Sequence, residues 1–200
     1  INFDNKGLSI DVSLHIGSFL AVVLYFKEDI LNFLKNKDLF FKILISSIPV
    51  MLVGFILVQF DLIDHLRNIK IIAWTTIIFG LLLFVSDKFE IKKSMSNSFN
   101  YKSAIFIGIL QILSLIPGVS RSGITISAAR MLKFNRYDSA KISFLISIPT
   151  LAAVSLFGLK NLIISNDINF SFLNLIAIFL SFIFSFLTIK FFLKYIKNFS

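Results

Sequence analysis

Cysteine is absent from this 200-residue sequence, and its absence excludes several kinds of chemistry at once. Without cysteine there are no disulfides, no thiolate nucleophile and no cysteine-ligated zinc site. Glutamate is almost as scarce, since Glu28 and Glu90 are the only two and both fall in polar segments between apolar runs. The sequence therefore offers no evident pair of carboxylates for general acid–base catalysis.

Charged residues are also few, at 16% of the sequence, whereas 56% of the residues are hydrophobic and 25 are phenylalanine. A soluble domain of this length does not need so much apolar sequence, so we expect an integral membrane protein with several spans. The formal net charge is +9, but the lysines fall in short loops between apolar runs. We interpret this pattern as a topology signal, with affinity for anionic lipid as a secondary interpretation, and expect no nucleic-acid partner.

Five apolar runs approach the length of about 20 residues that a transmembrane helix needs. They comprise residues 8–26, 39–60, 69–85, 143–159 and 170–189. Pro49 and Pro149 lie inside two of these runs, and we expect them to kink the helices rather than end them. Residues 27–35, between the first two runs, have the composition of a short amphipathic helix at the membrane surface. The fold class predicted is an all-α polytopic membrane protein with about five transmembrane helices, in one integral domain over residues 1–200.

A sixth apolar region, residues 101–132, behaves differently because Pro117 and Gly118 divide it. The two pieces, of about 14 and 11 residues, are each too short to cross a bilayer. A re-entrant helix–loop–helix fits better, since irregular backbone is tolerated where it lines a cavity. Lysine and arginine are abundant in the loops after the first run, after the third, after this region and after the last. Placing all four loops on one face requires the region to leave the membrane from the face it entered.

The middle of this hairpin holds Ser120, Arg121 and Ser122 between Gly118 and Gly123. An arginine at membrane depth costs roughly 3 kcal/mol on insertion scales, so it marks a functional site by default. Backbone N–H groups at the start of the following helix would converge with it on an anion, most simply a phosphate.

Simpler interpretations compete at each of these positions. Arg121 could reach the membrane surface with its side chain, and the nearby hydroxyls could be small helix-packing residues, which is our preferred interpretation for Thr125 and Ser127. Gln111 is more often a residue that bonds to a neighbouring helix than a catalyst. On balance we predict Arg121, Ser120 and Ser122 as catalytic residues, and Gly118, Gly123 and Gln111 as phosphate-binding residues.

Four other polar or aromatic residues have simpler interpretations. His15, near a helix start, and His65, in a polar turn, are expected to be structural or solvated. Trp74 is expected to anchor a helix at the membrane interface. Asp138 is expected to cap the N-terminus of the helix that follows it.

The hairpin sequence resembles the second signature of the bacterial undecaprenyl-diphosphatase, or bacitracin-resistance, family. The resemblance is carried by Gly108-x-x-Gln111-x-Leu-x-Leu-Ile-Pro-Gly-Val-Ser-Arg-Ser-Gly-Ile-Thr-Ile126 and Ser143-Phe-Leu-Ile-Ser-Ile-Pro149. It extends back to Ser9-Ile-Asp-Val-Ser-Leu-His15 and to Tyr25-Phe-Lys27, and the Pro-Gly-x-Ser-Arg-Ser-Gly core is its most specific part.

This resemblance implies hydrolysis of undecaprenyl diphosphate to the monophosphate that carries cell-wall precursors, with bacitracin competing for the substrate. It also implies two inverted repeats, each with a re-entrant hairpin, and a site where the hairpin tips meet. A divalent cation (Mg or Ca), a multi-pass location in the bacterial inner membrane and a homodimer are further expectations of the resemblance.

The sequence departs from the family at both ends. The first family signature, a Glu-x-x-x-Glu run followed by Pro-x-Ser-Ser-Thr-Gly-His, would precede Ile1, and a last span would follow Ser200. We therefore expect a fragment without metal ligands of its own, inactive as residues 1–200 alone, with the cation held by the substrate and the missing glutamates. Two rival functions are a transporter or flippase for an anionic prenyl-phosphate lipid, and a structural membrane subunit, which leaves Arg121 unexplained.

Overall fold

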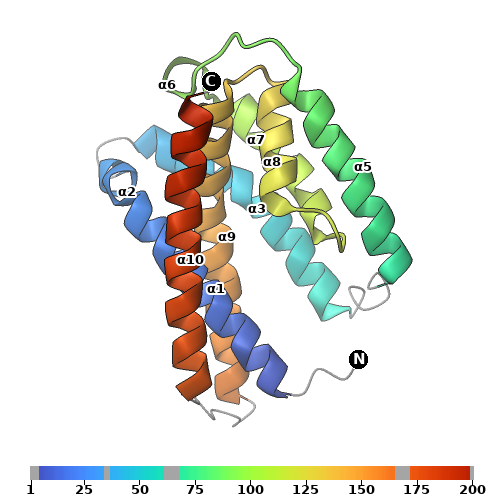
Figure 1. The fold of residues 1–200 in the computed structure, drawn as a ribbon, viewed down its shortest axis with the longest axis vertical. Coiled ribbons are helices and arrows are strands. Elements are labelled where there is room, and N and C mark those ends of the chain that lie inside the picture. The colour runs from blue at the N-terminus through green and yellow to red at the C-terminus, as the bar shows by residue number, and fades with distance from the viewer. Residues whose placement is uncertain (1–4, 34–36, 61–67, 165–171, 199–200) are drawn as a thin grey trace. The chain divides into compact units, whose positions relative to one another are not determined.

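The computed structural model describes residues 5–33, 37–60, 68–164 and 172–198, and these residues are almost entirely helical (Figure 1). Every element named here is an α-helix except η1, which is a 3₁₀ helix. The elements are α1 (Asn5–Tyr25), α2 (Lys27–Phe33), α3 (Lys37–Gln59), α5 (Ile69–Asp87), α6 (Met95–Ser98), α7 (Tyr101–Gln111), η1 (Ile112–Leu115), α8 (Arg121–Met131), α9 (Arg136–Ile164) and α10 (Phe172–Lys197).

Four of the helices, α3, α5, α9 and α10, are long and apolar enough to cross a membrane. Each coincides with a predicted span, and α1, which covers the first predicted span, is a shorter apolar helix over its residues 9–25. The prediction of an all-α polytopic membrane protein is therefore confirmed, with four rather than about five helices meeting the length criterion among the described residues. Pro49 and Pro149 do not end α3 and α9, which continue through them.

The chain divides into two compact units, which are described separately. The first unit contains residues 1–35 and 147–194. In it α1 packs so closely on α10 that a Cβ added at Gly17 would lie only 2.7 Å from the Cβ of Ser181. The hydroxyl of Ser18 lies 3.0 Å from that of Ser181 and 3.1 Å from that of Ser185. Small residues and interhelical hydroxyl bonds are the usual means of joining helices in lipid, where the hydrophobic effect does not drive them together.

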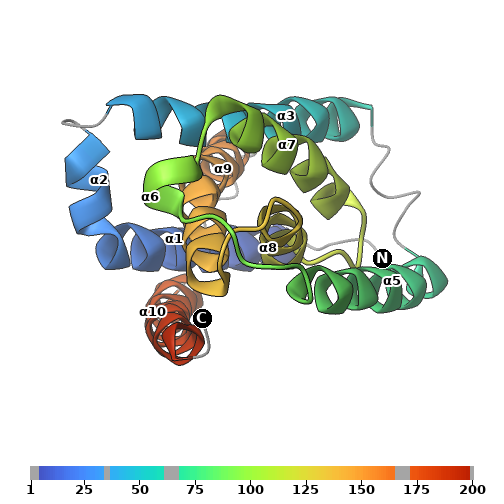
Figure 2. The same ribbon diagram turned by 90° about the horizontal axis from the view of Figure 1, so that it is seen from above.

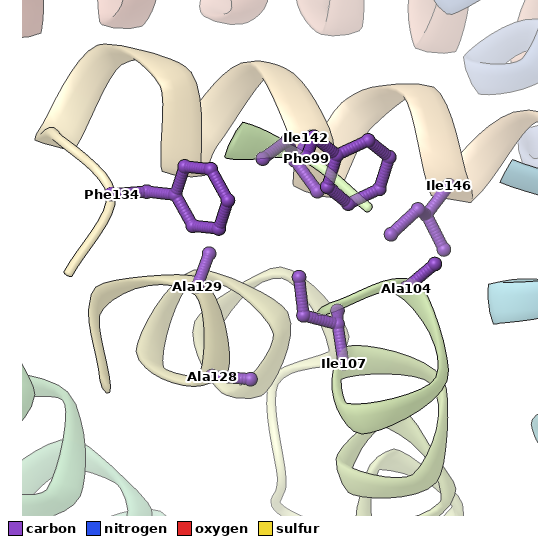
Figure 3. Close-up of a cluster of buried hydrophobic side chains, with 8 residues drawn as sticks. All are labelled: Phe99, Ala104, Ile107, Ala128, Ala129, Phe134, Ile142 and Ile146. Atoms are coloured by element: carbon purple, nitrogen blue, oxygen red, sulfur yellow. The ribbon is translucent and has the colours of Figure 1, made fainter. Parts of the chain in front are cut away.

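The second unit contains residues 36–146 and 195–200. Within it α7 lies along α3, and α8 lies between α7 and α5 (Figure 2). The approach of α7 to α3 depends on Gly108, where an added Cβ would come within 2.9 Å of the Cα of Ser46. Figure 3 shows the core of this unit, in which small alanines on α7 and α8 let larger side chains from α9 and the loops fill the centre. The cluster consists of Phe99, Ala104, Ile107, Ala128, Ala129, Phe134, Ile142 and Ile146.

The segment before α7 and the segment after α8 are hydrogen-bonded to each other. The backbone N–H groups of Lys92 and Lys93 donate to the carbonyl of Lys133 at 3.0 and 3.1 Å, and Asn135 N–H donates to the carbonyl of Lys93 at 3.2 Å. The rings of Phe99 and Phe134 pack edge to face beside these bonds. The two ends of the helix–loop–helix formed by α7, η1 and α8 therefore lie together, opposite its tip.

The prediction that Asp138 caps the following helix is wrong. The cap of α9 is Asn135, whose side-chain oxygen accepts a hydrogen bond from Asp138 N–H at 2.7 Å. Asp138 lies in the first turn of α9, and its carboxylate accepts from the backbone N–H of Met95, the first residue of α6, at 2.7 Å. It therefore caps a helix that is distant in sequence. His65 lies outside the described residues, whereas His15 and Trp74 are exposed on α1 and α5.

Candidate functional site

The tip of the hairpin is a tight turn made by Pro117 and Gly118. The carbonyl of Ile116 accepts a hydrogen bond from Val119 N–H at 3.1 Å, and Gly118 has a φ of +91°. Proline in the second position and a positive-φ glycine in the third are the pattern of a type II turn. The turn ends the α7–η1 segment and directs the chain into α8.

The turn rests against α5, through contacts that the sequence did not predict. Thr75 donates to the carbonyl of Pro117 at 2.7 Å, and Thr76 lies 3.2 Å from the carbonyl of Gly118. An added Cβ at Gly118 would lie 2.6 Å from the carbonyl oxygen of Ile72. Gly118 is thus required by the backbone shape and by the close approach to α5, while its predicted contact with phosphate stays a prediction. The sequence feature that could have indicated these contacts is the adjacent pair Thr75 and Thr76 within an apolar span.

The first turn of α8 brings Ser120, Arg121 and Ser122 together. Ser120 is the N-cap, and its hydroxyl accepts a hydrogen bond from Gly123 N–H at 3.2 Å. Arg121 is the first residue of the helix and is half-buried, whereas Ser122 is exposed, with its hydroxyl 3.3 Å from that of Ser120. The backbone N–H groups at the start of a helix have no intrahelical acceptor and carry partial positive charge. The first turn of α8 therefore carries an arginine, two serine hydroxyls and backbone N–H groups at one helix end.

Two further predicted site positions lie on the helices that lead to and from the tip. Gln111, the last residue of α7, is 1% exposed, and its side-chain oxygen is buried without a hydrogen-bond partner. An acceptor oxygen does not bind an anion, whereas the amide turned by half a rotation would present its NH₂ group. Phosphate binding by Gln111 stays a prediction, as does that by Gly123, whose N–H already bonds the cap.

The hydroxyls of Thr125 and Ser127 serve helix packing, as we expected. Thr125 is buried, and its hydroxyl lies 2.6 Å from that of Ser143 on α9. Ser127 donates to the carbonyl of Gly123 within its own helix at 2.8 Å. Both hydroxyls are therefore engaged within the protein, away from the exposed tip.

Among the described residues of the second unit, the carboxylates lie at the open end of the hairpin, away from its tip. Asp38 pairs with Lys42, whose ammonium lies 5.4 Å from the ring centre of Tyr101, the first residue of α7. The others are held near the segments that join α7 and α8 to the rest of the unit; they are Asp87, paired with Arg136, Glu90, paired with Lys92, and Asp138, bonded to Met95. An 11-residue helix such as α8 is about 16 Å long, so these groups lie far from the tip.

The described residues do not fit a divalent cation held by protein ligands. Among them, no group of three or more histidine, aspartate or glutamate side chains lies close enough together to hold a metal ion. The tip itself carries serine hydroxyls, backbone N–H groups and the positively charged Arg121. These groups can neutralise and orient phosphate oxygens.

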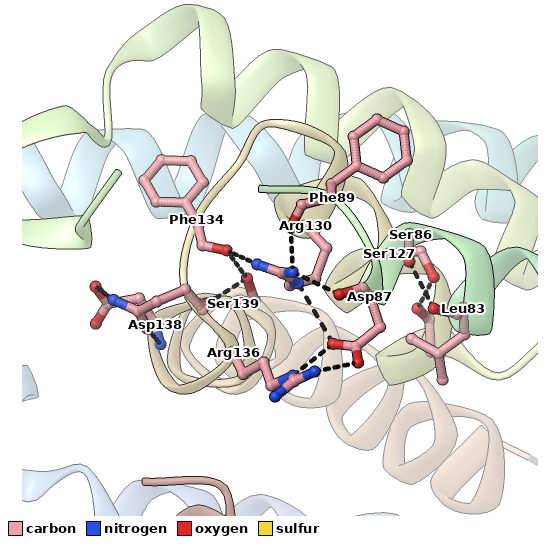
Figure 4. Close-up of polar contacts among 12 residues, drawn as sticks. Leu83, Ser86, Asp87, Phe89, Ser127, Arg130, Phe134, Arg136, Asp138 and Ser139 are labelled. Carbon is pink, nitrogen blue, oxygen red and sulfur yellow. Dashed lines mark hydrogen bonds and ion pairs between the residues drawn. The ribbon is translucent and has the colours of Figure 1, made fainter. Parts of the chain in front are cut away.

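The open end of the hairpin is held by a buried arginine (Figure 4). Arg130 is 2% exposed and donates to the carbonyls of Phe134, Asp87 and Phe89 at 2.5, 2.7 and 2.6 Å. The carboxylate of Asp87 accepts two hydrogen bonds from Arg136, at 2.8 and 2.7 Å. These contacts join the end of α5 to the end of α8 and the start of α9. In the sequence, both arginines indicated only topology, because nothing local identifies their partners.

Comparison with known proteins gives a consistent result over the whole chain. The family described as bacitracin resistance protein BacA matches residues 1–200. A protein of Pelagibacter ubique (strain HTCC1062), named undecaprenyl-diphosphatase, is 49% identical over 199 residues, which cover 99% of this chain and 77% of the relative. Proteins of the same name from Saccharophagus degradans and Aliivibrio salmonicida are 37% and 38% identical, over 98% and 99% of this chain and 78% and 79% of the relatives.

Proposed function

We propose that this chain, which belongs to the bacitracin resistance protein BacA family, hydrolyses undecaprenyl diphosphate to undecaprenyl phosphate and inorganic phosphate. The names of the relatives support this reaction, and the groups at the hairpin tip support its assignment as the binding site for the diphosphate. Release of the monophosphate returns the lipid carrier to cell-wall synthesis, and it lowers the amount of diphosphate that bacitracin can capture. The described helices make the chain a membrane protein, for which we propose the inner membrane of a bacterium.

The observation that carries the proposal is the position of Arg121 at the first residue of α8. A planar guanidinium can bind two phosphate oxygens at once, and the N–H groups of the same helix turn point toward the same anion. Ser122, exposed beside it, can donate its hydroxyl to a third oxygen. In phosphoryl transfer most of the catalysis comes from positioning and from stabilising charge on the transferring oxygens, which is the chemistry this tip provides.

Activation of the attacking water falls to a different part of the molecule. The carboxylates of the second unit's described residues lie at the opposite end of the hairpin, and Ser120 is engaged as a helix cap. We propose that the tip holds the diphosphate and neutralises charge, while a base that is not among the described residues of the second unit activates the water. A divalent cation, which the resemblance implies, would then be bound mainly by the substrate and by that other part.

The test is phosphate release from a prenyl diphosphate in detergent by the purified full-length protein that contains these 200 residues. We expect inorganic phosphate and the prenyl monophosphate in equal amounts, since one anhydride bond is cleaved per turnover. The rival function, a flippase for an anionic prenyl-phosphate lipid, predicts movement of the lipid across a reconstituted bilayer without phosphate release. That outcome would reject the proposed hydrolysis; the comparisons do not favour it.

We further propose that the helix–loop–helix of α7, η1 and α8 enters and leaves the membrane on the cytoplasmic face. The hydrogen bonds between residues 92–93 and 133–135 support this topology, because they hold the two ends together. Cysteines introduced at Ser96 and Lys141 should therefore show the same protection from an impermeant thiol reagent in intact cells. A cysteine at Ile69, which is exposed at the start of α5, should show the opposite accessibility to the reagent. The reason is that α5 is long and apolar enough to cross the membrane between Ile69 and Ser96. Opposite labelling at Ser96 and Lys141 would reject the topology.

A further inference from the structure

We propose that Thr75 and Thr76 of α5 are positioning residues for the phosphate-binding tip, acting on Arg121 through the backbone of the Pro117–Gly118 turn. The inference rests on the proposed function, since the arginine that they position is the one assigned to the diphosphate. It gives α5, which contributes no residue that contacts the phosphate in this proposal, an indirect part in the reaction.

The two threonines differ in how strongly they hold the turn. A hydroxyl has one hydrogen, so each must divide it between the turn and a carbonyl of its own helix. Thr75 lies 2.7 Å from the carbonyl of Pro117 and 2.8 Å from that of Ile71. Thr76 lies 3.2 Å from the carbonyl of Gly118 but 2.7 Å from that of Ile72. Thr75 is therefore the stronger contact of the two, and Thr76 the weaker.

The Pro117–Gly118 turn packs closely on α5, and this packing fixes where the two threonine hydroxyls meet the turn. An added Cβ at Gly118 would lie 2.6 Å from the carbonyl oxygen and 3.0 Å from the Cα of Ile72, so the turn lies directly on the backbone of α5. Threonine in a helix divides between two χ1 rotamers, and the hydrogen bond from Thr75 to the carbonyl of Ile71 favours the one that also reaches the turn. Arg121 follows Gly118 by three residues, through a turn and a cap that are both hydrogen-bonded. The backbone from which the Arg121 side chain extends is thus set relative to α5.

The same helix also holds the other end of α8. Arg130, near the C-terminal end of α8, donates to the carbonyls of Asp87 and Phe89 at and just beyond the C-terminal end of α5. Thr75 and Asp87 are about 18 Å apart along α5 at 1.5 Å per residue. Two attachments so far apart prevent α8 from sliding or tilting against α5 without breaking one of them. Misplacement of a catalytic group by about 1 Å can cost up to about a hundredfold in rate, so this bracing has a measurable effect on turnover.

The experiment compares Thr75→Val, which keeps the shape and removes the hydroxyl, with Thr75→Ser, which keeps the hydroxyl. We expect Thr75→Val to lower kcat by about tenfold with a smaller change in KM, because a displaced guanidinium loses more of its contact with the transition state than with bound substrate. Thr75→Ser should restore most of the activity, and Thr76→Val should cost less than Thr75→Val. Thr188→Val, at an exposed position on α10, is the matched control and should keep wild-type kcat.

Gly118→Ala provides a second variant that keeps both threonines. An alanine Cβ would clash with the hydroxyl oxygen of Thr75 and lie 2.6 Å from the carbonyl oxygen of Ile72, and it would disfavour the φ of +91°. It would therefore push the turn off α5, and kcat should fall at least as far as in Thr75→Val. Binding of a non-hydrolysable prenyl methylenediphosphonate should weaken less than kcat falls in both variants. The folded fraction of each preparation is measured in the same detergent, so that rates refer to folded protein.

The possible outcomes distinguish failure of the proposed function from failure of the positioning role of Thr75. If the full-length wild-type protein releases no phosphate, the proposed function fails, and the positioning role fails with it. If the wild type is active and Thr75→Val turns over as fast per folded molecule, the positioning role alone is wrong. If Thr75→Val lowers only the folded fraction, or if Thr75→Ser is as slow as Thr75→Val, the threonine serves only packing and the inference is overturned.

Discussion

Replacing Arg121 with lysine should lower the turnover of a prenyl diphosphate by at least about tenfold. The planar guanidinium binds two oxygens where an ammonium binds one, and a charge-assisted hydrogen bond contributes roughly 1.5–3 kcal/mol, against about 1.4 kcal/mol for a factor of ten in rate. Arg121 also occupies the first position of α8, so lysine keeps the helix start while losing the second contact. Turnover is measured as phosphate release under saturating substrate.

Arg136→Lys is the matched control for this substitution. Its side chain is 39% exposed and pairs with Asp87 at the open end of the hairpin, far from the tip. The same chemical change should therefore leave turnover within about twofold of wild type, since exposed ion pairs contribute about 1 kcal/mol or less. Hydrolysis by Arg121→Lys at the rate of the control would contradict the assignment of Arg121 to the phosphate.

Arg130→Ala should produce the largest loss of stability among single substitutions in this hairpin. The side chain is 2% exposed and donates to three backbone carbonyls, so its removal leaves these acceptors without this donor and removes the ion pair with Asp87 at 3.5 Å. Removing one partner of a buried charged group typically costs about 3–5 kcal/mol. Arg136→Ala, which removes the exposed partner of the same Asp87, should cost about 1 kcal/mol or less.

The measurement is equilibrium unfolding in mixed micelles for both variants and the wild type. Because both substitutions remove one positive charge next to Asp87, a change in net charge affects them equally, and burial is the main difference between them. Equal destabilisation by the two variants would show that the carbonyl contacts of Arg130 contribute little. The three carbonyls would then have to be satisfied by water at the membrane surface.

The helices could be predicted from the sequence because apolar runs of this length have few alternatives in lipid. A chain that crosses hydrocarbon must satisfy its own backbone hydrogen bonds, so each run of sufficient length becomes a helix. Pro117 and Gly118 were recognisable for the complementary reason, since their backbone preferences are local. The cap of α9 shows the limit of such local signals. Asn135 and Asp138 are three residues apart, and both residue types are good N-caps. We predicted Asp138, whereas Asn135 caps the helix.

The contacts that hold the site could not be predicted, because they depend on which helices become neighbours. Ser120, Arg121 and Ser122 were found together because they are adjacent in the chain. Thr75 reaches a carbonyl 42 residues away, and Arg130 reaches one 43 residues away. Nothing in the residues next to either side chain identifies its acceptor, and every backbone carbonyl is chemically alike. Such pairs become visible only when α5 is placed beside α8.

The joined ends of the hairpin also bear on how this part of the protein is made. The hydrogen bonds between residues 92–93 and 133–135 keep both lysine-rich flanks together. A segment with that geometry can enter the bilayer during synthesis without any polar flank being carried across, which is the step that most strongly opposes insertion of charged sequence. Because α5 precedes the hairpin in the chain, the helix that carries Thr75 is synthesised before the turn that docks on it.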